Sequence, residues 1–302
     1  MGDGNVVQNF AACEDGVTGD TFPNVKLELF QIALFILAGF LIEAITLADE
    51  SNTAKNVGFN LAWTAIRTFF DLTLGAAFWL WLTTITRLAG VKPMFPLAHI
   101  SWILPAIIIG FITRDFFYYW FHRLQHASRW LWAEHELHHS DEHMNVTTAL
   151  RHHWLETPIE SLLVTLPMTL LFGSPRLTVL SYLVSRSAGF FVHMNSRINL
   201  GRWFGSPALH RVHHSKLPEH IDKNFAPFIP LWDVIFGTYF APPQKVPPTG
   251  LISGETVYSL PRAVVMPFIS WAKISRSLVG YPDHLIAGVA IVGEHPVETS
   301  RR

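Results

Sequence analysis

Histidines carry the first chemical signal in this sequence. The chain has 16 His among 302 residues, and twelve of them fall between His122 and His214. Two stretches, 135–139 and 210–214, have the form His-x-x-His-His, and His122 and His126 are a further pair four residues apart. On a helix, residues at i, i+3 and i+4 share one side, so each motif can direct three imidazoles at one point. The spacing therefore predicts metal binding by histidine-rich helices.

The number of candidate ligands indicates two metal ions. Zinc prefers four ligands and octahedral ions take six, so the set is too large for one ion. Imidazole suits iron, copper, zinc and nickel, and the residue types alone do not choose among them. Cys13 is the only cysteine, which excludes a cluster held by several thiolates. The predicted metal ligands are His122, His126, His135, His138, His139, His193, His210, His213 and His214.

The remaining histidines are expected to have other roles. His143 either extends the face of His139 or faces solvent. His152 and His153 are adjacent and point about 100° apart on a helix, so a shared role is not expected for them. Structural or exposed positions are expected for His99, His220, His284 and His295.

Composition favours a membrane protein. Hydrophobic residues make up 50% of the chain, and its mean hydropathy is +0.28. Charged residues make up only 15%, whereas an average soluble domain has about 25%. The 22 Lys+Arg and 23 Asp+Glu leave a formal net charge of -1. This balance excludes the strongly basic surface that nucleic-acid binding requires.

Four apolar regions are long enough to enter or cross a bilayer, for which a helix needs about 20 residues. They are Leu27–Leu47, Leu61–Ile85, Met94–Thr113 and Ser161–Val192. The fourth is interrupted at residues 173–176 and is predicted to be a helical hairpin with both ends on one side. In the second, Arg67 and Asp71 either pair on one helical face or sit at the interface. In the third, Pro96 predicts the start of the helix and Pro105 a kink.

Together these patterns predict an all-α integral membrane protein. It would have about four transmembrane or re-entrant helices and a His-rich helical cap that holds a dinuclear metal site. The predicted segments are a polar tail at 1–26, a membrane-embedded domain with the His motifs at 27–245, and a C-terminal tail at 246–302. An interfacial helix is expected in that tail at 264–271. Lys and Arg are concentrated after the third span, which places the cap in the cytoplasm.

Two other classes of function fit parts of the pattern. Residues 135–139 also satisfy His-Glu-x-x-His, in which two histidines hold zinc and the glutamate is a general base. A membrane-embedded zinc metalloprotease using His135, Glu136 and His139 is therefore an alternative, although Arg211 replaces the glutamate in the second motif. A non-enzymatic metal transporter or store is another alternative. Transport favours polar ligands along the spans, where this sequence has almost no histidine.

The order and spacing of the motifs resemble the fatty acid hydroxylase/sterol desaturase superfamily, whose members are integral-membrane oxygenases with a histidine-ligated dinuclear iron centre. Bacterial sterol desaturase-like proteins are similar in particular. The resemblance covers about residues 60–245. It rests on 115–126, 134–140, 147–156, 193–195, 210–215, 222–225 and 232–239. It implies that the nine histidines above are iron ligands.

The resemblance also implies an activity. The protein would be an O2-dependent hydroxylase or desaturase acting on an unactivated C–H bond of a membrane lipid such as a fatty acyl chain or a sterol. Hydroxylation and desaturation differ in substrate placement, and both stay open. Two iron ions would be the cofactors and O2 the co-substrate. The sequence has no Gly-x-Gly-x-x-Gly loop, so an external donor is implied, either a cytochrome b5-like or ferredoxin-type protein or a pterin. A bacterial inner membrane is favoured over the endoplasmic reticulum.

Other polar residues near the motifs could orient imidazoles or add a ligand. These candidates are Asp115, Glu134, Arg151, His153, Glu156, Asp222, Asn224 and Asp233. Some fatty acyl hydroxylases of the superfamily have another histidine four residues before the one aligned with His193. Gly189 stands at that position here. The resemblance thus implies that one iron has one imidazole fewer and keeps a water or an open position.

Overall fold

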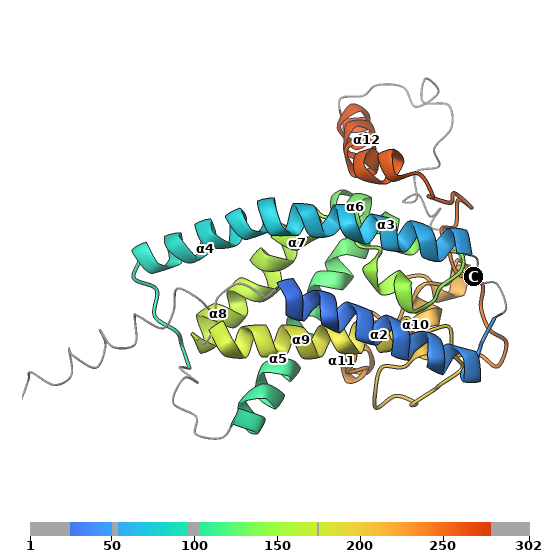
Figure 1. Cartoon of the computed structure of the whole chain (residues 1–302), viewed down its shortest axis with the longest axis horizontal. Helices are drawn as coiled ribbons and strands as arrows, with labels where there is room; N and C mark the ends of the chain where they lie inside the picture. Colours follow the sequence, from blue (N-terminus) through green and yellow to red (C-terminus); the bar gives the residue numbers. More distant parts are fainter. Residues whose placement is uncertain (1–24, 50–53, 96–102, 174, 279–302) are drawn as a thin grey trace, which may run out of the picture.

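The computed structural model describes residues 25–49, 54–95, 103–173 and 175–278, and this part of the chain is helical (Figure 1). Its only extended pairings are two isolated bridges, Leu47 with Ser196 and Ser215 with Thr249. The longer helices are α2 (Val25–Thr46), α3 (Ala54–Phe70), α4 (Ala76–Leu88), α5 (Ile103–Ala127), α6 (Arg129–His139), α9 (Pro175–Val192) and α12 (Leu260–Leu278). The shorter ones are η1 (Asp71–Gly75), η3 (Val146–Leu150), α7 (Glu156–Glu160), η4 (Ser161–Thr165), α8 (Leu166–Phe172), α10 (Pro207–His213), η5 (Pro218–His220) and α11 (Leu231–Ile235).

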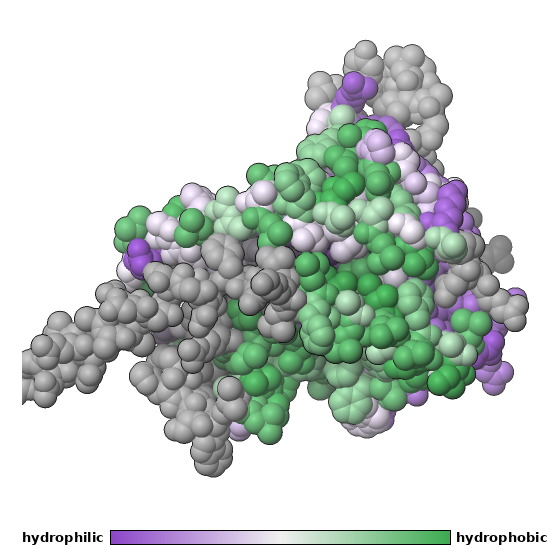
Figure 2. Space-filling model, viewed as in Figure 1, coloured by the Kyte–Doolittle hydropathy of each residue, from purple (hydrophilic) through white to green (hydrophobic). Residues whose placement is uncertain are grey.

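Two apolar helices match the first two predicted spans. α2, and the unbroken run of α3, η1 and α4, have the length and composition needed to cross a membrane. Leu37 of α2 and Leu80 of α4 are among their many exposed apolar side chains. Figure 2 shows a broad hydrophobic face on this side of the molecule. Of the two alternatives for Arg67 and Asp71, the structure shows the ion pair, with Nε and Oδ2 3.2 Å apart.

α5 takes the place of the third predicted span. The proposed start at Pro96 lies outside the described residues. Pro105 lies in the first turn of α5, where a proline removes no intrahelical hydrogen bond, so the kink predicted at this residue is wrong. The helix then runs without interruption to Ala127 and carries His122 and His126 beyond its apolar part, as predicted.

The predicted helical hairpin is present. α7, η4 and α8 form its first arm and α9 its second. The first arm ends at Gly173, whose φ of 61° is a left-handed conformation that glycine adopts without steric cost. α9 packs along α5, and a Cβ added at Gly110 of α5 would overlap Ser181 of α9. Close contact between these two helices places the end of α9 beside the histidines of α5.

The C-terminal segment packs against the helices that carry the histidines. α12 lies along α6, at the top of Figure 1. Met266 of α12 belongs to one buried cluster with Leu137 of α6 and Trp63 of α3. The indole of Trp271 donates to the carbonyl oxygen of Trp130, 2.7 Å away. α12 therefore covers the outer side of α6, the helix that carries the histidines of 135–139, and it includes the residues predicted as an interfacial helix.

Candidate metal centre

Five histidines from three helices form the first group. One ring nitrogen of each lies within 4.8 Å of those of the others. The indole of Trp132 and the ring of Phe225 flank this group, with centroids 4.9 and 5.1 Å from that of His126. Its members are His122 and His126 of α5, His135 and His139 of α6, and His213 of α10. The i, i+4 spacing within α5 and within α6 accounts for four of the five positions.

Four histidines form the second group, and again one nitrogen of each lies within 4.8 Å of the others. All four are buried. They are His138 of α6, His193 directly after α9, and His210 and His214 at the two ends of the α10 motif. The second group thus joins α6 and α10 to α9, a helix that contributes nothing to the first group.

The ring nitrogens of neighbouring histidines lie as close as metal ligands do. The Nε2–Nε2 distances are 3.1 Å for His122 and His135, 3.2 Å for His126 and His139, 3.1 Å for His138 and His193, 3.0 Å for His193 and His210, and 3.2 Å for His210 and His214. Two nitrogens bound at about 2.1 Å to one ion, at right angles, are about 3.0 Å apart. The observed spacing fits ligands that surround a cation.

Hydrogen bonds on the other ring nitrogen explain why a cation fits better than a hydrogen bond between rings. The Nδ1 atoms of His122, His193 and His213 lie 2.8, 2.7 and 2.8 Å from backbone carbonyl oxygens. A carbonyl only accepts, so each Nδ1 carries the proton and each Nε2 presents a lone pair. The single lone pair of His193 Nε2 faces two ring nitrogens, those of His138 and His210, at 3.1 and 3.0 Å, and a cation shared by the three rings satisfies this arrangement better than one hydrogen bond does.

Burial keeps these imidazoles neutral. It lowers the pKa of His135 to about 4 and that of His193 to about 3. For His138 and His139, burial and the neighbouring imidazoles hold the pKa well below its ordinary value. Only the neutral ring can bind a metal, so the protein presents its ligands in the binding form at neutral pH.

Sequence comparison finds a family to which this part of the chain is similar. The family model described as fatty acid hydroxylase matches residues 107–238, a range that contains all nine histidines of the two groups. This range is less than half of the chain, and over it the chain is similar to the fatty acid hydroxylase/sterol desaturase superfamily. No solved structure gives a significant match to it.

The curated relatives are enzymes whose names include a lipid. Human alkylglycerol monooxygenase is 38% identical over 140 residues, which are 45% of this chain and 31% of that protein. The same enzyme of Xenopus tropicalis is 37% identical over 141 residues, with 46% and 31% covered. The ornithine lipid hydroxylase of Rhizobium tropici is 30% identical over 167 residues, which are 54% of this chain and 50% of that protein. The match therefore spans from about a third to a half of the length of these relatives.

Two of the predicted accessory residues lie near histidines of the first group. Glu156 is buried, and its Oε2 lies 3.6 Å from Nδ1 of His135. Although burial alone would raise it, the pKa of Glu156 is held well below its ordinary value by His152 and His135. Asp222 is mostly exposed, and its Oδ1 lies 3.6 Å from Nδ1 of His126.

Three further candidates hold loops around the two histidine groups. Asp233 accepts hydrogen bonds from the backbone N–H groups of Phe225 and Ala226, and the carbonyl of Phe225 accepts the proton of His122. Asp115 accepts from the backbone of 228–229 and from the indole of Trp232. Asn224 bridges the carbonyl oxygens of Leu209 and Phe240. They fix the loop from which His122 obtains its hydrogen-bond acceptor.

The last three candidates point elsewhere. Arg151 donates to the carbonyl oxygens of Leu137 and Val257. The imidazole of His153 lies 3.3 Å from the carbonyl oxygen of Val264. Glu134 accepts from the amide of Gln125. Arg151 and His153 thus reach the segment around α12, and Glu134 joins α6 to α5.

His152 is a neighbour of the site that the sequence analysis did not single out. Its ring stacks on that of His138 with centroids 4.0 Å apart, and its Nδ1 lies 2.9 Å from Oε2 of Glu156. His135, His152 and Glu156 form a third set of potential ligands. The one available signal was the i, i+4 spacing of His152 and Glu156. Of the other histidines that are described, His143, His153 and His220 lie outside all three sets.

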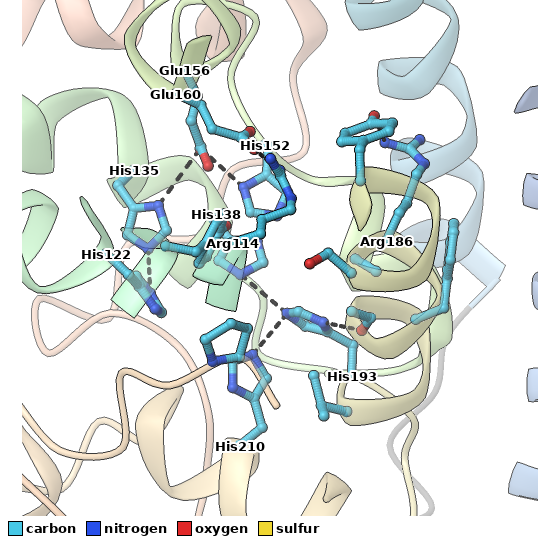
Figure 3. A pocket seen from close by; sticks show the side chains of 18 of the residues that line it. Arg114, His122, His135, His138, His152, Glu156, Glu160, Arg186, His193 and His210 are labelled. Atoms are coloured by element: carbon cyan, nitrogen blue, oxygen red, sulfur yellow. Dashed lines mark hydrogen bonds and ion pairs between the residues drawn. The ribbon is translucent and has the colours of Figure 1, made fainter. Parts of the chain in front are cut away.

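A cavity adjoins the two groups (Figure 3). Of the first group it exposes only His122 and His135. Of the second it exposes His138, His193 and His210. Gly189 also lines the cavity, and a Cβ placed there would have no neighbour within 4 Å. The second group therefore has free space beside it on the α9 side.

Proposed function

We propose that this protein is a non-haem di-iron oxidoreductase that uses O2 to hydroxylate an unactivated C–H bond of a membrane lipid. The observation that carries the proposal is the pairing of a five-imidazole group with a four-imidazole group beside one cavity. The first group would hold one iron and the second group the other. Two bound iron ions would supply the redox chemistry that reduces O2 and removes hydrogen from carbon.

The chain's own contribution is to hold and position the lipid. A C–H bond has no charge for the protein to recognise, so its position must be set by contacts elsewhere on the substrate. The cavity brings a substrate next to His138, His193 and His210, where Gly189 leaves space. The names of the relatives include monooxygenase and hydroxylase. They favour hydroxylation over desaturation.

The surroundings of the site support a membrane enzyme with an external reductant. α2 and the α3–η1–α4 run would anchor the domain at 27–245 in the membrane, with the histidine groups on the cytoplasmic side of a bacterial inner membrane. Electrons would come from a cytochrome b5-like or ferredoxin-type protein, or from a pterin.

The metalloprotease alternative receives no support from Glu136. The charged groups that act on its carboxyl group are Glu255, Arg262 and Lys273, which belong to the segment around α12. Burial and Glu255 raise the pKa of Glu136 to about 7. A general base of a zinc protease must face the metal, whereas the charged neighbours of Glu136 belong to the segment around α12 and not to the histidine groups.

Two measurements test the proposal. Metal analysis of the detergent-purified full chain should find close to two irons, and His138→Ala and His213→Ala should each lower the content, while the control His143→Ala should not. Lipid analysis of a host with and without the gene should find a lipid that gains the mass of one oxygen atom. A single zinc retained in both variants would contradict the di-iron centre. Peptide cleavage with unchanged lipids would favour the protease.

A further inference from the structure

The cavity beside the histidines is lined by charged residues from four helices. Arg67 comes from α3, Arg114 from α5, Glu160 from α7 and Arg186 from α9. A site that held only hydrocarbon would not require such groups, and burying them without partners is unfavourable. Figure 3 shows Arg114, Arg186 and Glu160 around the space above His193. Their partners indicate what the cavity is built to bind.

One face of α9 carries polar groups toward the cavity. Tyr182, Ser185, Arg186, Gly189 and His193 all line it, at the i, i+3, i+4, i+7 and i+11 positions of that face. Nη1 of Arg186 donates to the hydroxyl oxygen of Tyr182 at 3.0 Å. Nε of Arg186 and Oγ of Ser185 are buried, and neither has a hydrogen-bond partner in the described part of the chain.

The other arginines of the cavity are already paired with carboxylates. Arg67 pairs with Asp71, and Arg114 with Glu160. Arg114 is only 2% exposed, yet its Nε and Nη1 have no hydrogen-bond partner among the residues described. Arg186 forms no ion pair with any described carboxylate. The cavity therefore offers free N–H donors and one guanidinium, that of Arg186, without an ion pair among the described residues.

A second, small cavity adjoins the first and shares Arg67 and Arg186 with it. Its lining is mixed, with Thr64 and Asp71 beside apolar side chains. Leu29 of α2 and Leu72 of η1 also line it, both on helices suited to cross a membrane. Arg186 thus lies between the space beside the histidines and a cavity between the two candidate spans.

We infer that Arg186, Ser185 and the free N–H groups of Arg114 bind the polar head group of the lipid substrate, and that this head group offers acceptor oxygens and a negative charge. The inference rests on the proposed function and deepens it. The tail of the lipid leaves between α2 and η1, past Leu29 and Leu72. The C–H bond that reacts therefore belongs to the carbons near the head group and not to the end of the tail.

Binding of three probes with the same tail tests this inference. They are hexadecyl glycerol phosphate, hexadecyl glycerol and hexadecane, added to the purified, metal-loaded full chain in neutral detergent and measured by native mass spectrometry. The wild type should bind the phosphate about tenfold more tightly than the glycerol, because an ionic group strengthens hydrogen bonds to a guanidinium. Hexadecane should bind most weakly.

The variants separate the site from its surroundings. Arg186→Gln should abolish the preference for phosphate over glycerol, Arg186→Lys should keep part of it, and Ser185→Ala should weaken both oxygenated probes. Arg202→Gln is the matched control, because Arg202 is exposed and lines neither cavity. The inference is wrong if Arg186→Gln keeps the wild-type order, or if it weakens all three probes equally while metal content is retained.

The same experiment distinguishes failure of this inference from failure of the proposed function. Binding needs no turnover, so the preference can be present in a protein that oxidises no lipid. That result would remove the proposed function and keep the head-group site. A wild type that hydroxylates a host lipid but binds the three probes equally would keep the function and overturn the site.

Discussion

The two histidine groups differ in how much of their surroundings the protein fills. The five-histidine group is flanked by Trp132 and Phe225, and only two of its members reach the cavity. The four-histidine group depends on His193 for its connection to α9, and three of its members line the cavity. The first group is a nearly closed set of ligands, whereas the second leaves space for something that is not protein. This difference predicts unequal responses to similar substitutions.

The largest difference is expected when each group loses one histidine. His193→Ala leaves three imidazoles in the second group. The metal content of this variant should fall from two ions per chain toward one. His126→Ala leaves four imidazoles in the first group, enough for a tetrahedral ion, and the metal content of this variant should fall less. Metal analysis after dialysis against a chelator measures both. Equal losses in the two variants would show that the groups do not differ as inferred.

Whether a feature of this site can be predicted from the sequence depends on how far apart in the chain the residues that determine it lie. The helical placement of His122 and His126, and of 135–139, follows from spacing within a few residues, and the structure confirms it. The position of His152 over His138 does not follow from spacing. It depends on how the chain after η3 returns to α6, a tertiary contact that no local periodicity encodes.

The same reasoning applies to the fold. The apolar lengths of α2 and of the α3–η1–α4 run are local properties and were predicted correctly. A proline's effect, in contrast, depends on where its helix begins, and for this reason Pro105 causes no kink. The space at Gly189 could be anticipated only from a resemblance, because an absent side chain leaves no pattern of its own.

Removal of the buried carboxylate beside the first group should have the next largest effect. Glu156→Gln keeps the size of the side chain but removes the charge near Nδ1 of His135 and His152. Loss of such a partner typically weakens metal binding by about 10- to 100-fold. Competition with a chelator should show this loss in the first group, with Glu160→Gln as a control that lacks these contacts. An unchanged affinity would exclude a role for Glu156 in orienting His135.

Addition of a ligand to the open group should act in the opposite direction. Gly189→His places an imidazole four residues before His193 on the same face of α9, where a Cβ meets nothing within 4 Å. The second ion should then leave to a chelator about tenfold more slowly, equivalent to about 1.4 kcal/mol. Gly189→Leu fills the same space without a ligand and should not slow the loss. If both variants behave alike, the space is not next to the ion.

The smallest effect is expected at the exposed partner of the first group. The side chain of Asp222 is 63% exposed, so its charge near His126 is screened by water and Asp222→Asn should change metal affinity by less than about fivefold. Asp222 has a φ of 57°, which asparagine tolerates and a β-branched residue does not. Asp222→Val should therefore weaken binding more than Asp222→Asn, by displacing the Lys223 carbonyl that accepts from His213. Chelator competition on both variants separates the effect of the charge on metal affinity from the effect of the backbone conformation. A larger loss of affinity in Asp222→Asn would mean that the carboxylate itself matters to His126.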